Sequence, residues 1–377
     1  MRSSRLRVGI DARLAVRGLG IAQFILNLTR QIAPHVDVIW FGDPAAAPDG
    51  VASVHSIRGL PYPALDSAYG RFVAKSYELD VFHFTGNTGW TTGGPVPFVL
   101  TVHDVIFMDS GVRGRRTRQI AGHRYARWNL RRAIRHASAV ATVSQASADR
   151  LARHFPNLSI AVIPNATDVP TPRSQETKSF DFALAFGSRD PRKGLDLAYR
   201  GWVASGRTPG RLYVLCGGGL DTGFRRVAAT DVDAGRVKLL PYLSRADLLD
   251  WIRRAGVLLY PSLDEGFGLP VLEAMASGTP VITGLAPVTV EVGGDAVSHI
   301  DPLDPVTSIA ELLQKLAADK QWRSELARAG LRRAQTFSWS SSAARYLALY
   351  EVVSGLREGD SVNTGGTARS VKALSTK

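Results

Sequence analysis

The chain has 377 residues, of which 45% are hydrophobic and 21% charged, a composition that is ordinary for a globular protein and long enough for two domains. Its 46 basic and 33 acidic side chains give a net charge of +13, which favours an acidic partner such as a nucleic acid, an anionic membrane or a phosphorylated ligand. The single cysteine, Cys216, excludes an internal disulfide, and the sequence contains no apolar run long enough to span a membrane.

The first half of the chain alternates between short apolar runs, typical of buried strands, and segments with helical spacing. Residues 21–33 form the first such helix, directly after a glycine turn at Gly18 and Gly20. The predicted strands are residues 6–10, 36–41, 81–84, 98–102, 139–143 and 160–163. This alternation predicts a parallel, doubly wound sheet in a first domain of residues 1–170.

A second alternating series follows a polar, proline-containing stretch at residues 168–179, which is predicted to be a linker. The second domain is expected to cover residues 178–336, and a helix at about 337–353 is expected to pack back on the first domain. Its predicted strands are residues 182–186, 212–215, 237–240, 257–260 and 281–282. Residues 354–377 are rich in Gly, Ser and Thr, which predicts a disordered tail. The fold class is therefore α/β, with two Rossmann-like, doubly wound domains facing each other across a ligand cleft.

The most informative segment is Glu-Gly-Phe-Gly-Leu-Pro-Val-Leu-Glu, from Glu265 to Glu273, between a predicted strand and a helix predicted to begin at Pro270. A helix N-terminus attracts phosphate, and backbone without Cβ atoms lets a ligand approach closely. Four residues are predicted to present their backbone to that ligand: Gly266, Phe267, Gly268 and Leu269. Glu265 is placed in the loop and Glu273 in the first helical turn, where both accept hydrogen bonds from hydroxyls. Phosphates and hydroxyls together indicate a nucleotide-sugar; alternatively, Glu273 only complements the helix dipole and Glu265 is solvated.

Residues 257–284, from Val-Leu-Leu-Tyr through this segment to Pro-Val-Ile-Thr-Gly, resemble the signature of the family-four glycosyltransferases, and the resemblance extends more weakly over about residues 8–350. It implies the GT-B fold, retention of the anomeric configuration, and neither a metal ion nor a cofactor beyond the nucleotide diphosphate-sugar co-substrate. Asp11-Ala-Arg13 and Pro191-Arg192-Lys193 look like a subset that contains many mannosyltransferases, which favours GDP-mannose as donor, with a UDP-sugar as the alternative.

A basic segment follows the first strand of the second domain and contains Arg189, Arg192 and Lys193. An arginine fork and a compact lysine charge suit a diphosphate, whereas the alternative is a solvated basic loop. The resemblance assigns Lys193 to the diphosphate and leaves open which arginine assists it. Asp231 and Asp233, in the same predicted domain, are separated by one residue, a spacing at which two carboxylates can bind a divalent metal ion. They lie far in sequence from any phosphate-binding candidate, so no metal site is expected.

Other roles are implied by the resemblance, at or near the carboxyl ends of predicted strands. His103 is expected to contact the transferred sugar and, with Glu265 and Lys193, to make up the catalytic set. The donor-binding candidates added by the resemblance are Gly18, Gly20, Tyr242 and Leu243. The acceptor-side candidates are His83, Asn87 and Asp104.

An arginine-rich segment explains much of the positive charge, because no acidic residue lies between Asp109 and Asp149. Four arginines recur with helical spacing opposite an apolar stripe: Arg124, Arg127, Arg131 and Arg135. This stripe is either an ordinary solvated face or a contact with an anionic membrane. The start of the chain shows no signal-peptide pattern, so a cytoplasmic location is expected, with peripheral contact at the inner face of the membrane.

These observations together predict an enzyme that transfers a hexose from a nucleotide diphosphate-sugar to a hydroxyl of a glycan, glycolipid or natural-product acceptor. One alternative is an isomerase or epimerase of the same fold, which would turn over the donor without an acceptor. A basic nucleic-acid-binding protein is the other, but Glu265 and Glu273 would repel a phosphate backbone, so no nucleic-acid partner is expected.

Overall fold

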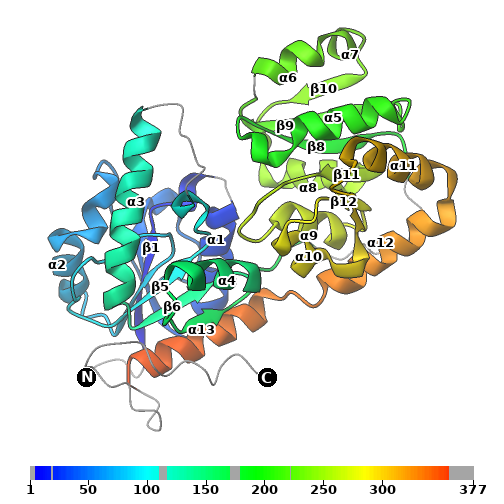
Figure 1. Cartoon of the computed structure of the whole chain (residues 1–377). Coiled ribbons are helices and arrows are strands. Elements are labelled where there is room, and N and C mark those ends of the chain that lie inside the picture. Colours follow the sequence, from blue (N-terminus) through cyan, green and yellow to red (C-terminus); the bar gives the residue numbers. More distant parts are fainter. Residues whose placement is uncertain (1–4, 18–19, 110–116, 170–178, 221, 356–377) are drawn as a thin grey trace. The chain divides into compact units, whose positions relative to one another are not determined.

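Two parallel sheets organise the chain in a computed structural model, which describes residues 5–17, 20–109, 117–169, 179–220 and 222–355. The chain divides into two units: unit 1 contains residues 1–165 and 338–377, and unit 2 contains residues 166–337. Helices lie on both faces of each sheet (Figure 1). The predicted α/β class with two doubly wound parallel sheets is therefore confirmed.

The sheet of unit 1 has seven parallel strands in the order β3-β2-β1-β4-β5-β6-β7. They are β1 (Arg7–Ala12), β2 (Asp37–Gly42), β3 (Ser53–Ser56), β4 (Val81–Phe84), β5 (Phe98–Val102), β6 (Ala139–Thr142) and β7 (Ile160–Val162). The two central strands β4 and β5 are buried along their whole length, as continuous apolar runs in a parallel sheet should be. The prediction missed β3, an edge strand whose residues are alternately half-buried and exposed.

Three helices of unit 1 follow a serine that satisfies one of their free N–H groups. Ser67, Ser144 and Ser338 each accept a hydrogen bond from the first turn of the helix that follows. The helices are η1 (Ala15–Arg17), α1 (Gly20–Ile32), η2 (Pro44–Ala46), η3 (Tyr62–Asp66), α2 (Ala68–Ser76), η4 (Ile106–Met108), α3 (Thr117–His136), α4 (Gln145–His154) and α13 (Trp339–Val353).

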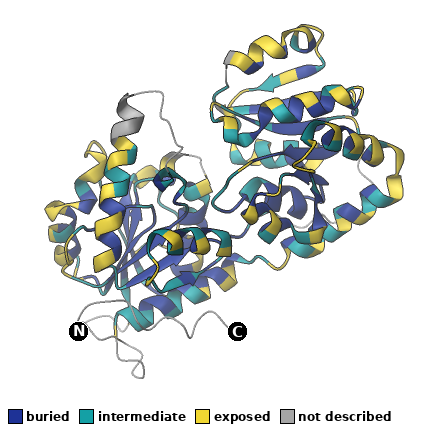
Figure 2. Ribbon diagram, in the orientation of Figure 1, coloured by how far each residue is buried: buried dark blue, intermediate teal, exposed yellow. Residues whose placement is uncertain are grey.

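The C-terminal helix α13 belongs to unit 1 and packs against α1 and β5. Tyr346 and Tyr350 are fully buried there, and the ring of Phe24 from α1 meets Tyr346 edge-on at 5.7 Å. Figure 2 shows the same pattern across both units: buried residues follow the strands, and the outer faces of the helices are exposed. The core of unit 1 is thus completed by the last described helix of the chain.

Unit 2 contains a six-stranded parallel sheet in the order β10-β9-β8-β11-β12-β13. Its strands are β8 (Ala183–Ser188), β9 (Leu212–Gly218), β10 (Val237–Leu240), β11 (Val257–Tyr260), β12 (Val281–Thr283) and β13 (Ser298–His299). Its helices are η5 (Pro191–Lys193), α5 (Leu195–Ala204), α6 (Thr222–Val227), α7 (Ala229–Asp233), α8 (Arg245–Arg254), α9 (Leu269–Ala276), α10 (Pro287–Gly293), η6 (Gly294–Ala296), α11 (Pro305–Ala318) and α12 (Lys320–Ala334).

The carboxylate of Asp231 forms a structural hub in unit 2. It is buried in α7, where it forms ion pairs with Arg207 and Arg236 and accepts a hydrogen bond of 2.9 Å from the Tyr199 hydroxyl. Burial alone would raise the pKa of Asp231, but the hydrogen bonds from these three partners outweigh it and lower the pKa to about 2. Within the described residues, no group of three His, Cys, Asp or Glu side chains is placed to hold a metal ion.

Several predictions of boundaries fall at the edge of the described residues. The chain passes from unit 1 to unit 2 between Asn165 and Ala166, a few residues before the predicted limit. Most of the predicted linker (170–178) and of the predicted tail (356–377) lies outside the described residues. Over the described ranges, no helix is both long enough and apolar enough to cross a bilayer.

Candidate functional site

The loop after β11 brings Glu265 and Lys193 into contact. Lys193 ends η5, which follows β8, and β8 is the neighbour of β11 in the sheet. The Lys193 Nζ atom lies 2.6 Å from Glu265 Oε1, although the two residues are 72 positions apart in sequence. Their side chains are 29% and 12% exposed, so a ligand at this edge of the sheet can reach both. Two of the three predicted catalytic residues therefore meet at the carboxyl ends of adjacent strands.

Two further side chains hold Glu265 in place. The hydroxyls of Tyr260 and Ser262 both donate to Glu265 Oε1, Ser262 at 2.7 Å. Burial, followed by the charge of Glu265, raises the pKa of Tyr260 well above its usual range, so this phenol stays protonated and remains a donor. Neither residue was predicted to belong to the site, although Tyr260 ends the predicted strand and Ser262 lies two residues later.

Close backbone packing shapes the two loops that contain these residues. Gly268 has φ +86° immediately before α9, and Gly194 has φ +70° immediately before α5. A Cβ atom on Gly194 would lie 2.3 Å from the Pro261 carbonyl oxygen, so only glycine lets η5 lie against the loop that contains Glu265.

The two candidate arginines of the basic segment are placed differently. Asp190 caps η5 and accepts hydrogen bonds from the Arg192 backbone N–H at 3.0 Å and from its Nε at 2.9 Å. Burial would raise the pKa of Asp190, but these bonds from Arg192 lower it. Arg189 is exposed, and its Nε lies close to Gly219, just past the end of β9. Arg192 is thus held by its own loop, whereas Arg189 extends along the carboxyl edge of the sheet.

The prediction for Glu273 was wrong in one respect, because α9 begins at Leu269 and Glu273 is its fifth residue, beyond the first turn. Its carboxylate is 3% exposed and is paired through Oε1 with Arg245, which also bonds Asp168 at 2.7 Å. Burial raises the pKa of Glu273, and the charge of Arg245 opposes that rise. Arg245 and Asp168 were not predicted as partners, since neither lies in a motif with Glu273.

The remaining donor-side candidates lie around the same edge of the sheet. Tyr242 is 69% exposed, and its ring covers Gly217 near the end of β9. Leu243 is half-buried, and Ser244 caps α8 by accepting a hydrogen bond from the Asp247 N–H. Gly266 and Leu269 are half-buried, whereas the Phe267 ring points into the fold and meets Phe337 at 5.8 Å. Phe267 can therefore offer a ligand only its backbone.

In unit 1, His103 lies directly after β5, at the carboxyl edge of the sheet. Its Nε2 is 2.8 Å from the Thr85 carbonyl oxygen, and its backbone N–H donates to Asn87 Oδ1 at 2.9 Å. Burial lowers the pKa of His103 to about 4, so the ring is neutral at pH 7. A carbonyl only accepts, so Nε2 carries the proton and Nδ1 keeps a lone pair that can accept a bond from a hydroxyl. Asp104, the neighbouring candidate, uses Oδ1 to accept the Ile106 N–H as η4 begins.

The expectation that His83 lies at the sheet edge was wrong. His83 is inside β4 and fully buried, with Nδ1 2.7 Å from the Tyr350 hydroxyl and Nε2 2.7 Å from Thr101 Oγ1. Burial, followed by the proximity of His103, lowers the pKa of His83 to about 3. Both ring nitrogens are used, so His83 is a satisfied core residue that fixes α13 to the sheet.

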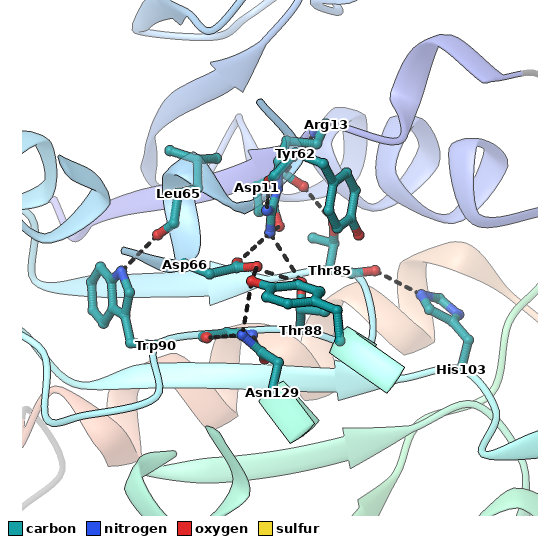
Figure 3. A network of polar contacts seen from close by, with 12 residues as sticks. Asp11, Arg13, Tyr62, Leu65, Asp66, Thr85, Thr88, Trp90, His103 and Asn129 are labelled. Carbon is teal, nitrogen blue, oxygen red and sulfur yellow. Dashed lines mark hydrogen bonds and ion pairs between the residues drawn. The ribbon is translucent and has the colours of Figure 1, made fainter. Parts of the chain in front are cut away.

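The sequence analysis also did not foresee an extensive buried ion network at the end of β1 (Figure 3). Arg13 Nη2 lies 2.7 Å from Asp11 and 2.8 Å from Asp66, and its guanidinium stacks on the Tyr62 ring at 4.6 Å. The Tyr125 hydroxyl donates to Asp66 as well, at 2.8 Å. Burial raises the pKa of Asp66, against the opposing charge of Arg13. The network fixes the chain after β1 to η3; of the two glycines that follow, Gly20 begins α1 and Gly18 lies outside the described residues.

The arginine stripe lies on α3, but its members are not equivalent. Arg127 is half-buried and donates to the backbone carbonyls of Phe107 at 2.6 Å and Asp109 at 3.1 Å, so it is anchored to the fold and is not a freely solvated member of the stripe. The outer face instead forms a shallow pocket of about 370 Å³ with an exposed tryptophan, lined by Arg124, Arg127, Trp128, Arg131, Arg132 and Arg135.

Comparison with known proteins covers most of the chain. The model of Glycosyltransferase Family 4 matches residues 19–170, and that of Glycosyl transferases group 1 matches residues 171–333. O-antigen chain mannosyltransferase B from Escherichia coli is 34% identical over 177 residues, and the alignment covers 46% of this chain and 46% of that protein. The chain thus matches just under half the length of this relative.

Two further similarities extend along nearly the whole chain. D-inositol 3-phosphate glycosyltransferase from Thermobifida fusca is 26% identical over 381 residues, covering 91% of this chain and 86% of that protein. The crystal structure of HepE from Anabaena in complex with UDP-glucose is similar with a TM-score of 0.66 at 18% identity, over 92% of this chain and 100% of that one. At that identity, the structural similarity establishes the fold.

Proposed function

This chain belongs to the family-four glycosyltransferases of GT-B fold, and on that premise we propose that it transfers a hexose from a nucleotide diphosphate-sugar to an acceptor hydroxyl with retention of configuration. The observation that carries the proposal is the pairing of Lys193 with Glu265 at 2.6 Å, at the carboxyl edge of the unit 2 sheet. In a donor complex, Lys193 bonds the diphosphate and Glu265 accepts a hydrogen bond from the sugar.

The main chemical requirement of the reaction is to stabilise the leaving nucleotide diphosphate. Negative charge develops on the diphosphate as the glycosidic bond breaks, and preorganised cations at that position lower the barrier. Lys193 supplies one such charge, and Arg189 supplies the second, because Arg192 is already engaged by Asp190. The departing phosphate oxygen takes the acceptor proton on the same face of the sugar, so no side-chain nucleophile and no metal ion are needed.

The nucleotide is proposed to lie along the same edge of unit 2. Glu273 Oε1 is held by Arg245, and its second oxygen accepts a ribose hydroxyl, while the exposed ring of Tyr242 lies against the base. GDP-mannose is the favoured donor, supported by the similarity to a mannosyltransferase; a UDP-sugar is the alternative, supported by the UDP-glucose that HepE binds.

Unit 1 is proposed to bind the acceptor, a glycan, glycolipid or natural product. At the carboxyl edge of its sheet, the neutral His103 ring accepts a hydroxyl of the transferred sugar through Nδ1, and its Nε2 is fixed by Thr85. Asn87 and Asp104 shape the same edge through their bonds to backbone N–H groups.

A panel of nucleotide-sugars tests the proposal, first by thermal shift and then by product formation. Glu265→Gln should lower sugar transfer with little change in nucleotide affinity, and Glu273→Gln should weaken nucleotide affinity by roughly 1.5–3 kcal/mol, the worth of a charged hydrogen bond. Unchanged transfer and affinity in both variants would refute the assignment. Conversion of the donor in the absence of any acceptor would favour an isomerase or epimerase instead.

The arginine face of α3 is proposed to hold the enzyme at the inner face of an anionic membrane, where each basic residue adds about 1 kcal/mol. Exposed Trp128 beside these arginines supports this, since tryptophan favours the membrane interface. Vesicles rich in acidic lipid should float the wild-type protein but not a variant with four exposed arginines (Arg124, Arg131, Arg132 and Arg135) replaced by Gln. Arg127 is kept because it bonds two backbone carbonyls. Equal flotation of both proteins would rule the membrane contact out.

A further inference from the structure

A cavity of about 730 Å³ opens in unit 2, at the edge of the sheet opposite to Glu265 and Lys193. Phe180 and Gly210 line it, and they precede β8 and β9, whereas Glu265 and Lys193 follow the ends of β11 and β8. In a parallel sheet these are opposite edges. The cavity is therefore separate from the proposed donor site, and its size falls within the range of small-molecule sites.

The wall of the cavity contains a buried cation. Arg323, in the first turns of α12, is only 6% exposed. One of its nitrogens donates to the Leu316 carbonyl near the end of α11, and the guanidinium stacks on the Phe180 ring at 5.1 Å. Its Nε is buried without a hydrogen-bond partner among the described residues, and over the same residues Arg323 forms no ion pair with a carboxylate.

Burying a charged guanidinium without a counter-ion is costly, and an anion in the cavity would remove that cost. Lys320 adds a second positive charge, since it lines the same cavity one helical turn before Arg323. Thr208 also lines the cavity. The two acidic residues nearest in sequence have other partners: Asp319 caps α12 through the Trp322 N–H, and Glu325 accepts a hydrogen bond from the Gln321 side chain.

We propose that this cavity binds a phosphate group, either free or on a small organic molecule. Arg323 supplies a planar fork of donors and Lys320 a point charge, the pair of groups that suits phosphate oxygens. Phe180 and Ala317 leave an apolar surface beside these charges, against which the organic part of a phosphate ester can pack. This site does not depend on the transferase activity proposed above.

The test is titration calorimetry of the full chain with inorganic phosphate and with glycerol 3-phosphate, at fixed ionic strength. The wild-type protein and Lys193→Ala should both show the site, because Lys193 lies at the other edge of the sheet. Lys320→Gln and Arg323→Lys should each weaken binding about tenfold or more, as expected for loss of a charged hydrogen bond. Arg328→Gln is the matched control, since it removes one exposed positive charge from the same helix.

The result with exposed Lys320 decides the test even if Arg323→Lys fails to fold. Equal affinity of Lys320→Gln and Arg328→Gln would overturn the proposal, as would the absence of saturable phosphate binding in the wild-type chain. Loss of all phosphate binding in Lys193→Ala would also overturn it, because the ligand would then occupy the donor site. Tighter binding of glycerol 3-phosphate than of phosphate identifies an organic phosphate as the ligand; equal binding identifies free phosphate.

Discussion

Both units place an ion pair after a central strand of a parallel sheet, but the two pairs differ in their access to solvent. In unit 2, the side chains of Lys193 and Glu265 are 29% and 12% exposed. In unit 1, Arg13, Asp11 and Asp66 are all at most 5% exposed. A pair that a ligand can reach can exchange one partner for a ligand group, whereas a sealed network cannot open without a large cost. Between these two ion pairs, exposure rather than charge separates the pair that a ligand can reach from the pair that holds the fold.

The largest expected effect is on the sealed network. Arg13→Met should destabilise unit 1 by about 3–5 kcal/mol, because two buried carboxylates lose their counter-ion. Hydrogen exchange of backbone amides in β1 and η3 would measure this, with amides in β11 as the internal reference. The control is Arg30→Met, at an exposed position of α1, which should change little. A loss below about 1 kcal/mol would contradict the idea that Arg13 is structural.

Mutation of the accessible Lys193–Glu265 pair should affect turnover rather than stability. Lys193→Ala should lower turnover by about 10²–10³-fold, the effect of removing one group that stabilises transition-state charge, with little loss of stability. Steady-state kinetics with the donor found in the panel would measure it. Exposed Lys238 in β10 offers the control, and Lys238→Ala should retain full turnover. If the two alanine variants differ by less than tenfold, Lys193 has no catalytic role.

The two units should also differ in acid sensitivity. His83 and His103 have pKa values lowered to about 3 and about 4, so both take up a proton only on unfolding once the pH falls below about 6.5. The unfolded state then binds more protons, and unit 1 should lose stability with a slope that rises from about 1.4 kcal/mol per pH unit at pH 6.5 toward about 2.7 kcal/mol per pH unit near pH 5. Asp231, with its pKa lowered to about 2, stabilises unit 2 above pH ~4, and this contribution is lost only below that value.

Hydrogen exchange at pH 7, 6 and 5, corrected for the intrinsic exchange rate, would separate the two responses. Amides in β4 and β5 should lose protection while those in β11 keep it. Parallel losses in both units would show that the buried histidines do not dominate the response.

The smallest effect tests how α13 is attached. Tyr350→Phe removes one hydrogen bond to His83 and leaves a buried ring nitrogen unsatisfied, at a cost of about 1–3 kcal/mol. Urea denaturation, monitored by a spectroscopic signal that reports on unit 1, would measure this loss of unfolding free energy. A matched surface pair is the control: the Tyr69 hydroxyl lies 2.8 Å from His55 Nε2 at an exposed position, so Tyr69→Phe should cost far less. Similar losses of stability in both variants would show that burial does not strengthen the hydrogen bond between Tyr350 and His83.

Local patterns predicted the strands well where most of their residues are apolar. β4, β5, β10 and β11 begin and end at the predicted residues, because each has at most one polar residue within its run. β3 and β13 were missed since their residues are polar or alternate in burial and occupy the edges of the sheets. The edge strand β10 was predicted correctly because three of its four residues are apolar, so the weak signal of β3 and β13 comes from their polar residues.

The residues of the candidate site also divide into those that a local pattern predicted and those that it did not. Glu265 and Lys193 were found because each lies in a motif of neighbouring residues. Arg245 was missed, since its partner Glu273 is 28 positions away in sequence. His83 was misplaced for the same reason, because the residue that buries it, Tyr350, is 267 positions away. Pairings that the fold creates across such distances leave no trace in a local pattern.

The position of α13 also sets the order in which the protein can be completed on the ribosome. Unit 1 begins with the first strand to be synthesised but needs Tyr346 and Tyr350 from α13 to fill its interior. The whole of unit 2 is translated in between, which takes on the order of ten to thirty seconds at ~5–20 residues per second. During that interval, the nascent chain presents an unfilled groove against α1 and β5, while unit 2 has all its own elements. Unit 1, whose synthesis begins first, is therefore the last unit to complete its fold.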